Sequence, residues 1–227
     1  MPTLLNTNEL SSLPLIVAGP ILRKVTATEV NIWLVTTQPL EGLVEISDAS
    51  TGEQYYSQPV STEHLLQVGE RAWVCMLTLQ GKFPTHKALR YQLDTQSGVL
   101  TELMPHLIYG EDKQAAQGVE FLISEKADYV LHGSCRNPHH FSKDTLVQAD
   151  AKVASQQITE RPDMLLMSGD QIYADHVAGP MLDAIEQLVE LLGLPDEEFE
   201  QAPIKNTQEL YQSPDCFYGR DNILPHY

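Results

Sequence analysis

The sequence is poor in basic residues, with 14 Lys and Arg against 31 Asp and Glu in 227 residues. The net charge of −17 argues against nucleic-acid and membrane partners, because both present phosphates that only a basic face can neutralise. The second half holds most of the excess, with 21 acidic and 8 basic residues in 111–227 against 10 and 6 in 1–110. A solvated acidic surface explains most of this charge, and carboxylates around bound cations are the alternative.

Cysteines and long apolar runs are also scarce. The three cysteines, Cys75, Cys135 and Cys216, cannot all pair within one chain, which excludes a disulfide framework. No uncharged apolar run approaches the length of a transmembrane helix, and residues 1–13 lack a basic segment followed by an apolar core. These absences predict a cytoplasmic protein. Hydrophobic residues make up 42% of the chain, which is enough for a folded core.

Before residue 110 the sequence has few helix signals and alternates in the manner of strands. Apolar and polar residues alternate in short runs that are separated by turn sequences such as 48–52. The predicted strands are residues 15–25, 29–37, 42–46, 54–60, 71–79 and 89–94. Short strands at this spacing predict an antiparallel β-sandwich of about seven strands, of the fibronectin or immunoglobulin type.

The second half changes to a strand–helix–strand pattern. Residues 128–133 and 163–169 are short apolar runs typical of buried strands, and residues 142–161 carry a helical stripe that Ser142 can cap. Such a unit predicts that the two strands are parallel neighbours. Two parallel strands alone leave their faces uncovered, so this part should expose apolar surface.

A second helix is predicted to start at Gly179-Pro180 and to end at Gly193. A sandwich followed by an α/β part predicts two domains. We therefore expect a β-sandwich domain over residues 1–108 and an α/β domain over residues 109–227.

Chemistry-bearing residues follow both predicted parallel strands. Gly-Ser-Cys-Arg occupies 133–136, and Gly-Asp-Gln-Ile-Tyr-Ala-Asp-His occupies 169–176. Since ligands of parallel sheets bind outside the carboxyl ends of the strands, these segments should meet at one edge. Taken singly, a cysteine there is usually a small buried hydrophobe and an aspartate a turn residue. Because several such residues follow two adjacent strands, they indicate a functional site.

These two motifs resemble the opening of a PhoD-like phosphatase (alkaline phosphatase D type), in the metallophosphoesterase superfamily. Members of that family carry a β-sandwich before the phosphoesterase domain, and the segment Cys-Phe-Tyr-Gly-Arg at 216–220 also resembles a family stretch. The resemblance implies a hydrolase of phosphate mono- and diesters that contains Fe(III) and Ca(II). It implies that Cys135 and Tyr173 bind the iron and that Asp170 bridges the two metals.

The donor chemistry agrees with this implication. A phenolate and a carboxylate are hard oxygen donors that suit a ferric ion, and a bound metal deprotonates a thiol. Arg136 is a candidate phosphate clamp because its planar guanidinium matches phosphate oxygens, and a surface cation is the alternative. The adjacent pair His139-His140 is interpreted as a loop feature, and Asp175 and His176 as residues that support the metal ligands from outside.

The family draws further ligands from later Asn- and His-containing motifs, and residues 177–227 contain none of them. This predicts a truncated N-terminal portion of the family's metallophosphatase domain, whose partner would be the missing C-terminal part. The alternative is a non-catalytic binding or interaction module left by truncation. A zinc site that combines Cys135 with nearby histidines is a third reading, against which the absence of a Cys-x-x-Cys spacing argues.

Overall fold

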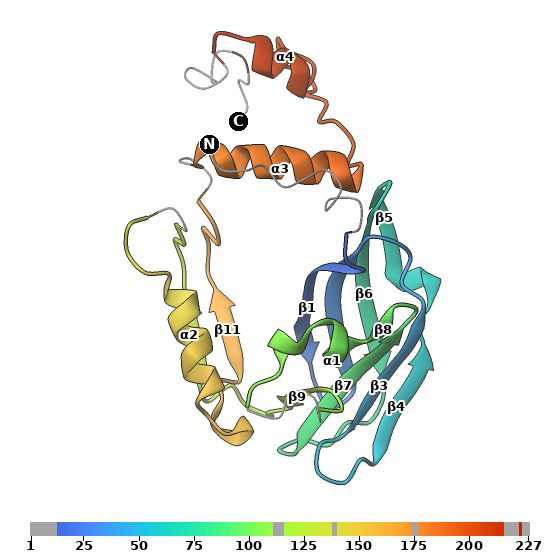
Figure 1. Ribbon diagram of the computed structural model, residues 1–227. Helices are drawn as coiled ribbons and strands as arrows, with labels where there is room; N and C mark the ends of the chain where they lie inside the picture. The colour runs from blue at the N-terminus through green and yellow to red at the C-terminus, as the bar shows by residue number, and fades with distance from the viewer. Residues whose placement is uncertain (1–12, 111–115, 138–139, 174–176, 216–222, 224–227) are drawn as a thin grey trace.

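The computed structural model describes residues 13–110, 116–137, 140–173, 177–215 and 223. Its larger part consists of two antiparallel sheets (Figure 1). The strands of the first sheet, in spatial order, are β1 (Ile16–Val25), β2 (Glu29–Thr36), β6 (Ala72–Gln80) and β5 (Leu65–Gly69). The second sheet has the order β4 (Gln54–Pro59), β3 (Gly42–Asp48), β7 (Ala88–Thr95) and β8 (Gly98–Val99), and β9 (Val119–Leu122) also pairs with β7.

All six strand runs predicted in the first half are present, and they pack as two sheets around one core. In β2 the alternation places Val30, Ile32 and Leu34 on one face, where each is 0% exposed. Ile46 of β3 and Leu93 of β7 approach from the other sheet and belong to the same buried cluster. The mostly β architecture is therefore that of a β-sandwich, as alternation predicts.

The second sheet includes a strand that lies beyond the predicted domain boundary near residue 108. Strand β9 pairs with β7 over four residues, and Phe121 and Ile123 are buried in the sandwich core. Two short helical turns follow β8: α1 (Leu100–Leu103) and a 3-10 turn (Pro105–Leu107). Another 3-10 turn, Thr62–His64, precedes β5.

The predicted strand–helix–strand unit is present. Strands β10 (Val130–Gly133) and β11 (Met164–Met167) pair in parallel, and α2 (Thr145–Ala154) connects them. A 3-10 turn, Ile158–Glu160, follows the helix.

Ser142 is not the helix cap, so this part of the prediction was wrong. The Oγ atom of Ser142 lies 2.8 Å from Nδ1 of His140, and the Asp144 side chain accepts the Leu146 N–H at 3.0 Å in its place. Helix α2 therefore begins two residues later than a cap at Ser142 predicts, and it ends before the 3-10 turn.

The strands β10 and β11 are exposed, although their composition predicts burial. Leu165 of β11 is 54% exposed and Leu166 is 47% exposed, because a sheet of two strands leaves its faces uncovered. The expectation that this part exposes apolar surface is confirmed.

Helix α3 (Gly179–Leu192) ends at Gly193, whose φ of 59° is the left-handed conformation of a glycine cap. The end of α3 joins the sandwich, since the Glu70 N–H donates to the Gly193 carbonyl at 3.0 Å and the Arg71 N–H to the Leu192 carbonyl at 2.8 Å. A short helix, α4 (Thr207–Gln212), follows. Within the described residues, no helix combines the length and apolar character needed to span a membrane.

Candidate metal site

The loops that follow β10 and β11 are joined by backbone hydrogen bonds. The Cys135 N–H donates to the Gly169 carbonyl at 3.3 Å, and the Arg136 N–H donates to the Asp170 carbonyl at 2.9 Å. The Arg136 carbonyl in turn accepts the Tyr173 N–H at 2.8 Å. The parallel pairing of the strands thus continues into the loops and brings the two sequence motifs together.

Two of the predicted ligand residues converge on a carboxylate oxygen of the third. The Tyr173 hydroxyl donates to Oδ2 of Asp170 at 3.0 Å, and Sγ of Cys135 lies 3.4 Å from the same oxygen. Cys135 and Asp170 are exposed and Tyr173 is half-buried, so the group is open to solvent at the carboxyl edge of the β10–β11 sheet. We call Cys135, Asp170 and Tyr173 the triad.

Two members of the triad have unusual backbone conformations. Cys135 has a φ of 57° and Asp170 a φ of 43°, which places both residues in the left-handed region that side chains with a Cβ disfavour. Gly169, with a φ of 136°, allows the turn directly before Asp170. Strained residues cluster at functional sites, where the surrounding structure holds them. Sequence reasoning missed this feature, because only the glycine before Asp170 hints at it.

The hydrogen bonds within the triad strengthen the hold of Tyr173 on its phenol proton. The pKa of Tyr173 is raised to about 12, first by its hydrogen bond with the Cys135 thiol and then by the one with Asp170. A bound cation would reverse this preference, since metal ligation requires the deprotonated thiolate and phenolate.

Two of the three donors of the triad, the carboxylate and the phenol, suit a hard cation, whereas the thiol is a softer sulfur donor. One thiol, one carboxylate and one phenol supply sulfur and oxygen donors, and the carboxylate has two oxygens with which to serve two ions. Among the described residues, no group of three or more His, Cys, Asp or Glu side chains could hold a metal, and the triad contains only two residues of these types. Tyrosine supplies the third donor.

Arg136, the predicted phosphate clamp, is engaged with the first residue before helix α2. Its Nη2 lies 2.6 Å and its Nε 3.1 Å from Oδ2 of Asp144. The hydrogen bond from Arg136 and that from the Leu146 N–H lower the pKa of Asp144, so the carboxylate is charged at neutral pH. Asp144 therefore fixes the guanidinium beside the loop that carries Cys135.

The other predicted site residues lie at different places. Of the histidines near the two motifs, His140 pairs with Ser142, as described above, and His132 lies with Nε2 2.7 Å from the Ser168 hydroxyl oxygen. The remaining ones fall outside the described residues: His139, Asp175, His176 and the segment 216–220.

A cavity of about 460 Å³ opens beside the triad, between α2 and the β10–β11 sheet. Cys135 and Arg136 line it together with apolar residues of the helix and both strands. Sequence patterns give no sign of this cavity, because it depends on how far the helix stands from the sheet.

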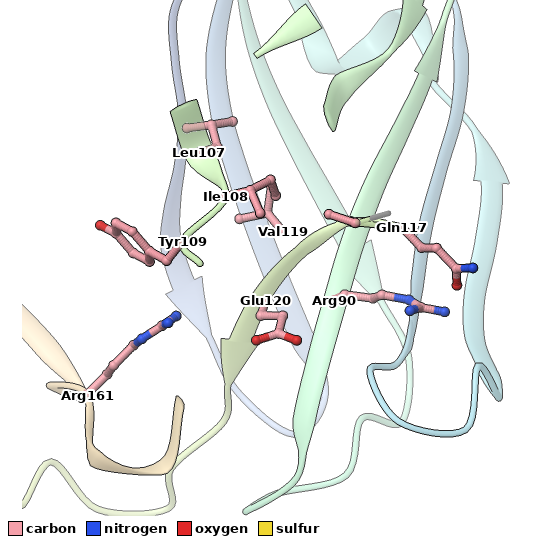
Figure 2. Close-up of a pocket in the computed structure, with 10 residues that line it drawn as sticks. Arg90, Leu107, Ile108, Tyr109, Gln117, Val119, Glu120 and Arg161 are labelled. Atoms are coloured by element: carbon pink, nitrogen blue, oxygen red, sulfur yellow. The ribbon is translucent and has the colours of Figure 1, made fainter. Parts of the chain in front are cut away.

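A second cavity of about 460 Å³ lies next to β9 (Figure 2). Figure 2 shows Arg161 reaching toward Tyr109, and its guanidinium lies 4.9 Å from the centre of that ring. Nε of Arg90 donates to the Ser47 hydroxyl at 3.0 Å. Both cationic groups therefore make contacts within the protein, and we assign no ligand to this cavity.

No family model, curated protein or solved structure matches the chain.

Proposed function

We propose that the chain carries the site of a PhoD-like metal-dependent phosphatase or phosphodiesterase, which hydrolyses phosphate esters with Fe(III) and Ca(II). The observation that supports it best is the convergence of Cys135 and Tyr173 on Oδ2 of Asp170. The resemblance of the two motifs to that family gives the reaction type. The parallel β10–β11 pair supports the α/β metallophosphoesterase part of the proposal, because it presents the triad at the edge where such sheets bind ligands.

The residues have separate roles in this proposal. Cys135 and Tyr173 would hold the iron, and Asp170 would serve both cations. When bound, the metal ions supply Lewis-acid activation of the phosphate ester and of the attacking water. Arg136 would orient the phosphate with the N–H groups that do not face Asp144, while Asp144 holds the guanidinium in place.

The test is hydrolysis of p-nitrophenyl phosphate and bis-p-nitrophenyl phosphate by the full chain loaded with iron and calcium. We expect turnover by the wild type and its loss in Asp170→Ala, which removes the carboxylate shared by both cations. Asp183→Ala is the matched control, since this exposed aspartate of α3 lies outside the triad. Metal content is measured in parallel. A metal-loaded wild type that hydrolyses neither ester contradicts the proposed activity.

A specific observation also favours a non-catalytic interaction module. Besides the uncovered apolar side chains of β11, helix α3 exposes Leu182, Ile185 and Leu188, each 44–46% exposed. Exposed apolar faces of this kind often mark contact surfaces. A folded wild type that binds no iron and hydrolyses neither ester supports this second function.

A further inference from the structure

We propose that the cavity between α2 and the β10–β11 sheet binds the alcohol part of the substrate, so that the protein selects phosphate esters of apolar alcohols. This inference rests on the proposed function, since it assigns the substrate class of the same site.

The walls of the cavity are apolar on both sides. Leu131, Leu165 and Met167 line it from the sheet, and Leu146 and Ala149 line it from α2. Its volume of about 460 Å³ lies within the range of small-molecule sites, which are mostly apolar with a few polar groups. An alkyl or aryl group that enters the cavity leaves water, and binding is favoured in proportion to the apolar area removed.

The cavity connects directly to the triad. Cys135 lines the cavity and also lies 3.4 Å from Asp170. A phosphate held by metals at the triad would therefore have the cavity on one side of it. The substituent on its ester oxygen can extend between the helix and the sheet.

The rim of the cavity is cationic in an otherwise acidic half of the chain. Arg136 and Lys143 line it, whereas the half that contains them has 21 acidic and 8 basic residues. Asp144 is the one carboxylate among the described lining residues, and it is paired with Arg136. A cationic rim above an apolar interior matches an anion with an apolar tail, and a phosphate ester of an apolar alcohol has this form.

The first measurement compares hexyl phosphate with ethyl phosphate as substrates of the metal-loaded full chain. Their alcohols are similarly poor leaving groups, so a difference in kcat/KM measures how much binding of the alkyl group in the cavity contributes. We expect kcat/KM to be at least ten-fold higher for hexyl phosphate. Hydrolysis of both esters at equal kcat/KM would overturn the cavity proposal and leave the phosphatase proposal intact.

Two matched variants of α2 locate the effect. Ala149→Phe fills the cavity and should lower the hexyl-to-ethyl ratio about ten-fold, whereas Ala151→Phe adds the same ring at an exposed position outside the lining and should keep the ratio. Circular dichroism checks that both variants fold. An unchanged ratio in folded Ala149→Phe would place the selectivity elsewhere and overturn the assignment.

A binding measurement on the wild type needs neither turnover nor a variant. Hexylphosphonate and ethylphosphonate, which are not hydrolysed, are titrated into the metal-loaded chain by calorimetry. We expect hexylphosphonate to bind at least ten-fold more tightly, and equal affinities would overturn the proposal even where Ala149→Phe does not fold. Tight hexylphosphonate binding without hydrolysis of any ester would contradict the phosphatase proposal while keeping the cavity as a binding site.

Discussion

Replacing Cys135 by glycine should stabilise its loop while it removes a proposed iron ligand. The φ of 57° at this position lies in the left-handed region, which costs a residue with a Cβ about 1–2 kcal/mol. Glycine adopts this conformation freely but loses about 0.5–1 kcal/mol more backbone freedom on folding. The difference favours Cys135→Gly over Cys135→Ala by roughly 0.5–1 kcal/mol.

The right comparison is glycine against alanine, since both variants lack the thiol and differ only in the Cβ. At Ser134, which lies outside the left-handed region, the same pair should have the opposite order, with alanine the more stable. A change of sign between neighbouring positions isolates backbone strain from the loss of a side-chain contact.

Amide hydrogen exchange of the metal-free protein measures this difference locally. The Cys135 and Arg136 amides donate across to the loop after β11, so their exchange reports the opening of the two loops. Exchange should be about two- to five-fold slower in Cys135→Gly than in Cys135→Ala, since 1.4 kcal/mol is about ten-fold. Equal rates, or faster exchange in the glycine variant, would refute the assignment of strain at this position.

Three further outcomes are expected. The wild type with ferric iron should show a visible charge-transfer band that Tyr173→Phe shifts or removes, and a colourless wild type that retains iron would remove Tyr173 from the site. Leu34→Ala should cost about 2–5 kcal/mol in urea unfolding, because Leu34 is 0% exposed in the sandwich core, and a loss below about 1 kcal/mol would contradict its burial there. Asp48 is buried, and its pKa is lowered by the Ser50 hydroxyl and by the Thr51 and Ser50 N–H groups. Its stabilising effect is therefore present above the unfolded pKa of about 3.9 and is lost as the pH falls through the lower folded pKa. In an acid titration, Asp48→Asn should lose less stability in that pH window than the wild type does.

The parts of the fold that could be predicted are those in which one face is buried. In β2 the apolar side chains occupy alternate positions because the core lies on one side only. Strand β5, by contrast, has three consecutive exposed residues in an edge position, so its sequence carries no alternation. Strand β9 is four residues long and forms because β7 has a free edge for it, which no local pattern reveals.

The candidate site could be predicted in its residue types and not in its details. The position of Cys135 and Asp170 after parallel strands follows from the strand–helix–strand pattern. Their left-handed backbones depend on hydrogen bonds between two loops 35 residues apart in the sequence, which spacing cannot show. The engagement of Arg136 by Asp144 depends in the same way on where α2 begins. Metal binding by the triad stays a prediction.

The buried core and the proposed metal site lie in different parts of the chain. The sandwich holds the large buried cluster, whereas the β10–β11 pair has exposed faces and carries strained loops at its end. Regions with few buried apolar contacts open most readily, so the triad lies on the less stable part.

A ligand that contacts all three side chains of the triad should therefore stabilise this part selectively. A ligand at a concentration one hundred times its dissociation constant stabilises the folded state by about 2.7 kcal/mol. This exceeds the strain of about 1–2 kcal/mol at either one of the two left-handed residues. Addition of ferric iron should slow amide exchange of residues 130–136 in the wild type, and the Tyr173→Phe variant should need more iron for the same protection. Exchange in β2 should stay unchanged, because its protection comes from the sandwich core. If iron instead protects β2 and residues 130–136 alike, the ion acts on the whole protein and the triad is not its site.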